Sequence, residues 1–139
     1  MTYRRRIQVE FNHCDPAGIV FYPRYFEMTN SVVENFFADV LEYPFSRIHI
    51  EEHSCIPTVQ IEASFVAPSR LGEVLEFTLD VEHIGRSSMR LIQRANAGGQ
   101  VKLQVTLTLV WVERDGRAAP WPEGIRQKLT AFMETRDGA

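Results

Sequence analysis

The chain has 139 residues, 45% hydrophobic and 24% charged, a composition typical of one globular domain spanning residues 1–139. A formal net charge of −3 gives no overall basic field, so nucleic acid is not an expected partner. Apolar runs are short, as in Leu109–Val112, and none follows Arg4–Arg6, so we expect neither a membrane span nor a signal peptide. Two cysteines make no disulfide framework, so we expect free thiols and a cytoplasmic protein.

Hydrophobic periodicity predicts a strand and then a long helix in the first part of the chain. Residues 7–11 alternate apolar and polar, which predicts a half-buried strand with residues 4–6 as its solvated beginning. From Tyr25 to about Leu41 apolar residues recur three and four positions apart, the spacing of one helix face, and Pro23 suits a first helical turn. Residues 42–55 have no clean period and are expected to form a connector.

Four more strands and a second helix are expected after the connector. Alternation or turn residues predict strands at residues 59–65, 75–81, 87–95 and 101–111, a hairpin turn at residues 97–100, and a helix from Pro122 to about Thr135. Short connections favour antiparallel pairing, which makes the fold α+β. One long helix leaves much of a sheet and its edges uncovered, which favours association with a second copy.

Three polar residues, His13, Cys14 and Asp15, stand together between the first strand and the long helix. An Asp before Pro is an ordinary turn residue, but loops held by rigid elements also carry functional side chains. Backbone N–H groups of a helix starting near Tyr22 would stabilise an oxyanion, while the Asp15 carboxylate attacks an acyl carbon or deprotonates water. His13 is an alternative general base and Cys14 an alternative nucleophile. We expect Cys14 to be a small buried residue and His13 to form a local hydrogen bond.

Other sequence motifs typical of metal or catalytic sites give weaker indications of an active site. The segment His49–His53 fits the H-x-x-E-H zinc pattern, but it lies in the connector and has no evident third ligand. No metal or cofactor is therefore expected. Glu27 and Glu34 would act as bases only if they faced a pocket, and we expect them on the solvated helix surface. The chain has no G-x-S-x-G elbow and no phosphate-binding glycine loop.

The run Asp15–Val20, followed by Tyr22, Pro23 and Tyr25, resembles the active-site signature of the 4-hydroxybenzoyl-CoA thioesterases of the hotdog-fold superfamily. Ala63–Val66 also matches in place, and the resemblance covers essentially the whole chain. It implies a five-stranded antiparallel sheet wrapped around a long central helix, and an acyl-CoA thioesterase active as a homodimer or homotetramer with active sites at a subunit interface. It also implies that Asp15 is the catalytic carboxylate and that the Tyr22 N–H donates to the thioester carbonyl.

Departures from that family leave the acyl group open. Position 13 is His where the hydroxybenzoyl enzyme has an acid, and position 30 is Asn where that enzyme has an Asp that engages the ring hydroxyl. Met28 replaces a bulkier aromatic residue. Aromatic acyl groups and short or medium aliphatic ones thus remain candidates. The expected substrate contacts are His13, Gly18, Phe26, Met28, Asn30, Pro57 and Thr58, together with Arg86, Ser87 and Ser88 for the phosphates of coenzyme A.

Thioester hydrolysis by so few groups is chemically reasonable. A thiol has a pKa of about 8.5, so coenzyme A departs largely as thiolate without a dedicated acid. The sequence leaves open whether Asp15 forms an anhydride or activates water. It also leaves open a hotdog-fold dehydratase, an acyl-carrier-protein thioesterase and a non-catalytic acyl-CoA-binding module.

Overall fold

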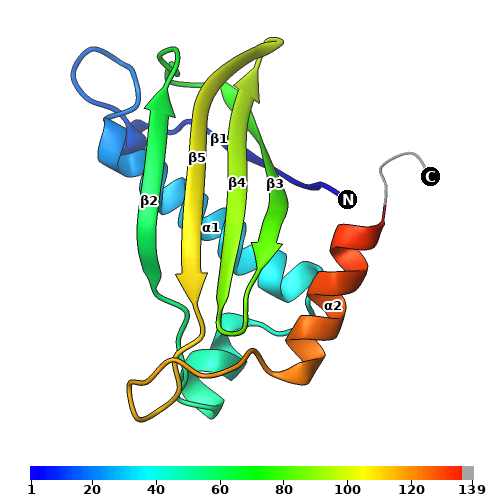
Figure 1. The fold of residues 1–139 in the computed structure, drawn as a ribbon. Coiled ribbons are helices and arrows are strands. Elements are labelled where there is room, and N and C mark those ends of the chain that lie inside the picture. Colours follow the sequence, from blue (N-terminus) through cyan, green and yellow to red (C-terminus); the bar gives the residue numbers. More distant parts are fainter. Residues whose placement is uncertain (136–139) are drawn as a thin grey trace.

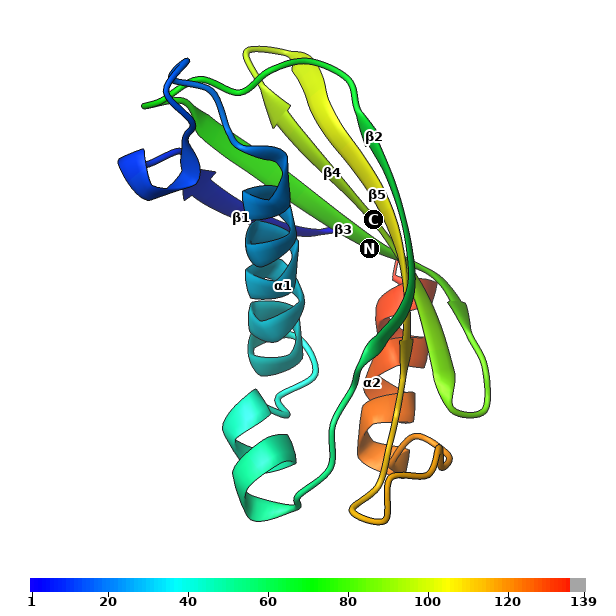
Figure 2. The same ribbon diagram turned by 90° about the vertical axis from the view of Figure 1, so that its left-hand side faces the viewer.

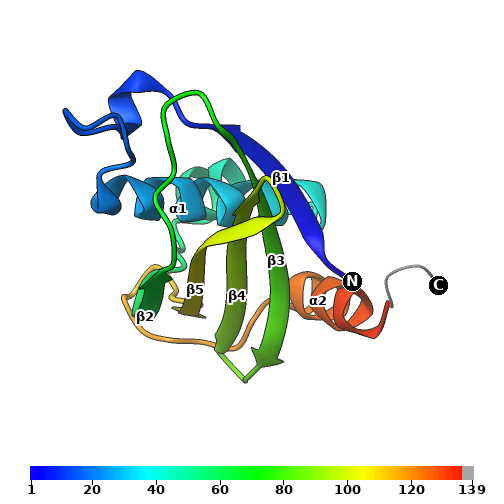
Figure 3. The ribbon, with the colours of Figure 1, turned by 90° about the horizontal axis from the view of Figure 1, so that it is seen from above.

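The computed structural model describes residues 1–135 and contains one five-stranded antiparallel sheet curved around a long helix (Figure 1). The strands follow the order β1-β3-β4-β5-β2 across the sheet, which leaves β1 and β2 as its edges (Figure 3). This is the hotdog arrangement that the resemblance implies. The elements are β1 (Tyr3–Gln8), η1 (Phe11–His13), α1 (Tyr22–Asp39), η2 (Ser46–Glu51), β2 (Thr58–Phe65), β3 (Val74–Ile84), β4 (Ser88–Ala97), β5 (Gln100–Val110) and α2 (Glu123–Glu134).

Both long helices pack on the concave face of the sheet (Figure 2). The inner face of α1 buries residues three and four apart, including Val32 and Phe36, against core side chains of the sheet such as Phe77 and Leu91. Phe36 also meets Phe132 of α2, with ring centroids 5.1 Å apart. Burial of this apolar stripe, rather than helix propensity, is the main source of stability for α1.

The beginning of the first strand agrees with the prediction, but its end does not. Residues 4–6 belong to β1, as expected of its solvated beginning, and the strand ends at Gln8. Arg4 and Arg6 fit a strand because both form ion pairs with Glu76 of β3, on the exposed convex face. The predicted continuation to residue 11 is wrong, since Phe11 begins η1 and its side chain is 83% exposed.

The observed boundaries of the later helices and strands agree with the predicted ones within three residues, and the structure contains one short helix that was not predicted. The hairpin between β4 and β5 is confirmed, and Gly98 and Gly99 adopt the positive φ values, 57° and 76°, that such a turn needs. The connector expected to be irregular contains η2, which is anchored by the fully buried Ile48. No helix in residues 1–135 is long and apolar enough to cross a membrane.

Candidate active site

Asp15 lies in a tight loop that leads directly into α1. Cys14 and Val20 form an isolated antiparallel bridge that closes the loop. Within it, the Asp15 N–H donates to the Ile19 carbonyl at 3.0 Å, and the Gly18 N–H donates to the Asp15 carbonyl at 2.9 Å. Gly18 has φ = +77°, a backbone conformation that glycine adopts without steric cost. The sequence of this loop therefore specifies a defined turn rather than a flexible linker.

The Asp15 carboxylate is half-buried and only partly engaged. Its Oδ1 accepts a hydrogen bond from the Ala17 N–H at 2.9 Å, an Asx-turn that fixes the side chain. Within residues 1–135, Oδ2 has no hydrogen-bond partner. An ionised carboxylate has acceptor capacity on both oxygens, so Asp15 retains one oxygen for a substrate or a water molecule.

A buried serine fixes the loop against the first turn of α1. The Val20 N–H donates to the Ser69 carbonyl at 2.9 Å, and the Tyr25 hydroxyl donates to Ser69 Oγ at 2.8 Å. Ser69 is fully buried. Burial raises the pKa of Tyr25 above its ordinary value, which keeps its hydroxyl protonated as the donor. These contacts hold Asp15 at the same end of the molecule as the start of α1.

The amino end of α1 has an available amide. The N-cap residue is Phe21, which has no side chain able to cap the helix, and its own N–H donates to the His13 carbonyl at 2.9 Å. Over the described part of the chain, the N–H of Tyr22 has no acceptor. Unpaired N–H groups at the positive end of a helix dipole favour a partial negative charge, such as that on a polarised carbonyl oxygen.

An aromatic cluster joins this helix end to the rest of the concave face. Phe65, at the end of β2, packs its ring against Tyr22, Tyr25 and Phe26, with centroid separations of 5.7, 5.9 and 6.3 Å. Phe65 is still 49% exposed, because β2 is an edge strand and no described element lies beyond it.

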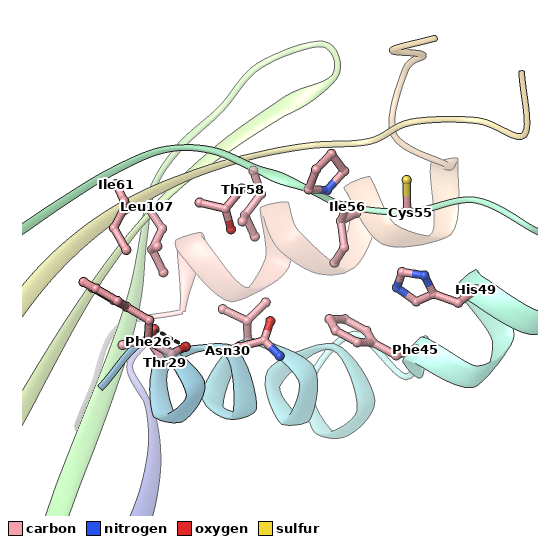
Figure 4. A pocket seen from close by; sticks show the side chains of 13 residues that line it. Phe26, Thr29, Asn30, Phe45, His49, Cys55, Ile56, Thr58, Ile61 and Leu107 are labelled. Carbon is pink, nitrogen blue, oxygen red and sulfur yellow. Dashed lines mark hydrogen bonds between the residues drawn. The ribbon is translucent and has the colours of Figure 1, made fainter. Parts of the chain in front are cut away.

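Next to the cluster, a groove of about 680 Å³ runs between α1 and β2 (Figure 4). One face of α1 forms one wall, β2 and the residues just before it form the other, and two leucines of β5 lie between them. The region of η2 closes one end. The groove is mostly apolar, which suits the burial of an acyl group. Its lining residues are Phe26, Thr29, Asn30, Val33, Phe45, His49, Cys55, Ile56, Pro57, Thr58, Ile61, Leu107 and Leu109.

The structure brings four of the expected acyl contacts together in this groove: Phe26, Asn30, Pro57 and Thr58. Met28 does not line it. Two positions along a helix correspond to about 200° of rotation, so Met28 lies on the opposite side of α1 from Phe26. Its side chain is 2% exposed and lines a separate hollow beside β1 and η1.

His13 lines that second hollow rather than the groove. Its Nδ1 accepts a hydrogen bond from the Glu10 N–H at 2.9 Å, the local bond that the sequence predicts. The half-buried Cys14 thiol donates to the Glu10 carbonyl at 3.5 Å. Glu27 also lines this hollow, but its side chain is exposed and forms an ion pair with Arg24. Glu34 is exposed, as expected.

Sequence reasoning missed the end of the groove that η2 and the residues on either side of it form. Phe45, His49 and Cys55 line it, although the connector has no period to reveal its fold. The sequence marks His49 only as part of a zinc pattern. No group of three or more potential metal ligands occurs within residues 1–135.

The predicted phosphate-binding turn lies far from Asp15 within one chain. Arg86 and Ser87 connect β3 to β4, whose first residue is Ser88, at the opposite end of the sheet from the Asp15 loop (Figure 1). The 11 residues of β3 separate the two regions by about 35 Å at the usual rise of a strand. The Arg86 carbonyl accepts from the Trp121 N–H at 3.1 Å, and its side chain is exposed.

Comparison with known proteins agrees with this architecture. A family model described as the Thioesterase-like superfamily matches residues 9–129. The 4-hydroxybenzoyl-CoA thioesterase of Pseudomonas sp. (strain CBS-3) is 31% identical over 107 residues, which are 74% of each chain. Its structure superposes with a TM-score of 0.83 at 26% identity, covering 91% of this chain and 97% of that one.

Two further solved structures are similar over nearly their full lengths. The gentisyl-coenzyme A thioesterase BH1999 has a TM-score of 0.80 at 25% identity, covering 91% of this chain and 99% of that one. A thioesterase from Thermus thermophilus, complexed with coenzyme A and Zn, has a TM-score of 0.82 at 26% identity, covering 96% and 95% of the two chains. Fold and relatives together define the class, a hotdog-fold thioester hydrolase. The chain belongs to the thioesterase-like superfamily, among the relatives of 4-hydroxybenzoyl-CoA thioesterase.

Proposed function

We propose that this protein hydrolyses the thioester of an aromatic, or a short or medium aliphatic, acyl-CoA to a carboxylic acid and free coenzyme A. The observation that carries the proposal is the combination at the start of α1: the unengaged oxygen of Asp15, the unpaired N–H of Tyr22 and, one helical turn further on, Phe26 in the lining of an apolar groove. The aryl-CoA names of the Pseudomonas and gentisyl relatives support an aromatic acyl group.

The chemistry needs only these groups and water. The Tyr22 N–H donates to the thioester carbonyl oxygen and stabilises the negative charge that develops there. Asp15 either attacks the carbonyl carbon, giving an anhydride that water then cleaves, or removes a proton from the attacking water. The C–S bond breaks and coenzyme A leaves as thiolate, so the leaving group needs no separate acid.

We further propose that the complete site forms between two subunits. The separation of about 35 Å along β3 prevents Asp15 and Arg86 of one chain from holding the two ends of one acyl-CoA. The edge strand β2 also exposes apolar side chains, among them Val59 and Ile61, and an open edge pairs readily with a second copy. The Arg86 guanidinium of one subunit would then bind a phosphate of the substrate whose thioester lies at Asp15 of the other.

Mixing two inactive variants tests the shared site. If Asp15 and Arg86 act from different subunits, hybrids of Asp15→Asn and Arg86→Ala chains contain one intact site, and mixed dimers regain activity that neither parent has. No recovery after verified subunit exchange, or a monomer in sedimentation equilibrium, would contradict the shared site.

Both free cysteines, Cys14 and Cys55, are compatible with the cytoplasmic location that we propose.

The hydrolytic function itself is tested with a panel of benzoyl, hydroxybenzoyl, phenylacetyl and aliphatic CoA thioesters. We expect these substrates to release free coenzyme A thiol, which is measured by its reaction with a chromogenic disulfide. Hydration of an enoyl-CoA without thiol release would instead indicate a dehydratase. Hydrolysis confined to acyl carrier protein would indicate a carrier-protein thioesterase, and tight binding without turnover a binding module.

A further inference from the structure

The groove also carries information about the acyl group that it accepts. We propose, on the basis of the hydrolytic function above, that the preferred acyl group extends beyond a single aromatic ring and bears an uncharged hydroxyl at its far end. The residue that binds this hydroxyl is His49 of η2. His49 is therefore a specificity-determining residue for a class of extended hydroxyacyl-CoA substrates.

The size of the groove indicates an extended acyl group. A closed apolar cavity of about 150 Å³ holds one benzene molecule, whereas the groove measures about 680 Å³. Along α1 it is lined by Phe26, Asn30 and Val33, which stand four and three residues apart on one helix face. The helical rise from Tyr22, at the proposed carbonyl position, to Val33 is about 16 Å. One ring attached to the carbonyl would leave the distal half of the groove empty.

His49 lies at the distal end of the groove, opposite the end formed by Phe26 (Figure 4). Its ring packs edge-to-face on Phe45, with centroids 5.3 Å apart, and Phe45 packs in turn on Phe37 of α1 at 5.8 Å. These contacts orient the imidazole without using its nitrogens. No hydrogen bond to the His49 side chain occurs in the described part of the chain. A neutral imidazole therefore offers a substrate one donor and one acceptor.

The other lining groups favour an uncharged substituent. None of the 13 lining residues is Asp, Glu, Lys or Arg, so a carboxylate or an amine on the acyl group would lose hydration without gaining a permanent countercharge. The Thr29 hydroxyl is already committed to the Phe26 carbonyl at 3.1 Å. A hydroxyl, in contrast, both donates and accepts, which matches an imidazole at the end of an apolar channel.

Matched substrate pairs test the proposal. One rigid pair is 4-biphenylcarbonyl-CoA and its 4′-hydroxy derivative, and one flexible pair is decanoyl-CoA and 10-hydroxydecanoyl-CoA, with benzoyl-CoA as the short reference. We expect higher kcat/KM for the extended acyl groups than for benzoyl-CoA. In at least one pair, the hydroxyl should add a factor of roughly 5 to 10, the usual contribution of one neutral hydrogen bond.

Variants of His49 distinguish a loss of hydroxyl binding from a general loss of hydrolytic activity. In His49→Phe the preference for the hydroxylated member should disappear while hydrolysis of the unsubstituted member is retained, and His49→Gln should keep part of the preference. His83→Phe, a change at an exposed histidine outside the groove, should leave the preference intact. Because His49 is exposed, these variants should fold.

The outcomes distinguish the two proposals. If benzoyl-CoA is hydrolysed but the extended substrates are poorer, or if His49→Phe keeps the hydroxyl preference, the inference about the groove is wrong and the hydrolytic function stands. If no acyl-CoA releases thiol, both proposals are refuted.

Discussion

Replacing Gly18 with alanine adds one methyl group at the centre of the Asp15 loop. An ideal Cβ at this position meets no atom within 4 Å, so the substitution causes no clash. Its cost comes from the backbone, because φ = +77° lies in the left-handed region. A non-glycine residue there raises the free energy of the native state by roughly 1–2 kcal/mol. We expect Gly18→Ala to lower the free energy of unfolding by about that amount, or to shift the loop so that Asp15 moves.

Gly116 supplies a matched control. It has φ = +82° and equally open surroundings, but it lies in the turn after β5, away from the Asp15 loop. Urea unfolding should show a similar loss of stability for Gly116→Ala, whereas thiol release should fall only in Gly18→Ala. Equal activity of the two variants would show that the loop conformation is irrelevant to catalysis. Unchanged stability in both would refute the strain argument.

Three further predictions concern the supports of the site. Tyr25→Phe and Ser69→Ala each break the same buried hydrogen bond and should lower the free energy of unfolding in urea by about 1–3 kcal/mol. The double variant should lose less than the sum of the two single losses, and simple additivity would contradict the coupling of the two side chains. Burial, aided by the hydrogen bond to Glu52, raises the pKa of Tyr43 to about 12, so its stabilising contribution is complete below pH 10 and disappears as pH rises towards 12. Tyr43→Phe should therefore weaken the loss of Tm between pH 10 and 12, and an unchanged pH profile would contradict this cause. Glu27→Gln and Glu34→Gln should retain most thioesterase activity, because both carboxylates are exposed; collapse of kcat in either would move the base onto α1.

The sequence predicts elements best where the periodicity of side chains reflects the environment directly. The alternation in residues 75–81 and the three-and-four spacing after Tyr25 correctly predict β3 and α1, because each element has one buried face. The start of β1 is predicted correctly, but its end is not, because the alternation of apolar residues continues to Phe11. Only the pairing with β3, which ends at Gln8, shows where the strand stops.

In the candidate site, too, residues close together in the sequence could be predicted, whereas residues brought together by tertiary contacts could not. Asp15 and Tyr22 could be proposed from the local sequence and the resemblance, since both belong to one short segment. The distal end of the groove could not, because it depends on His49 of η2, and η2 is anchored chiefly by one buried side chain, Ile48. No periodic signal marks such a short helix, so only its tertiary contacts place His49 opposite α1.

The most direct test of the account is the turnover of Asp15→Asn compared with Asp115→Asn. Both aspartates accept a backbone N–H two residues ahead at 2.9 Å, so each substitution removes one charge from the same local geometry. We predict that kcat for acyl-CoA hydrolysis falls at least about 100-fold in Asp15→Asn, while substrate binding and the Asp115→Asn control stay near wild type. Full turnover by Asp15→Asn would contradict the central role of this carboxylate.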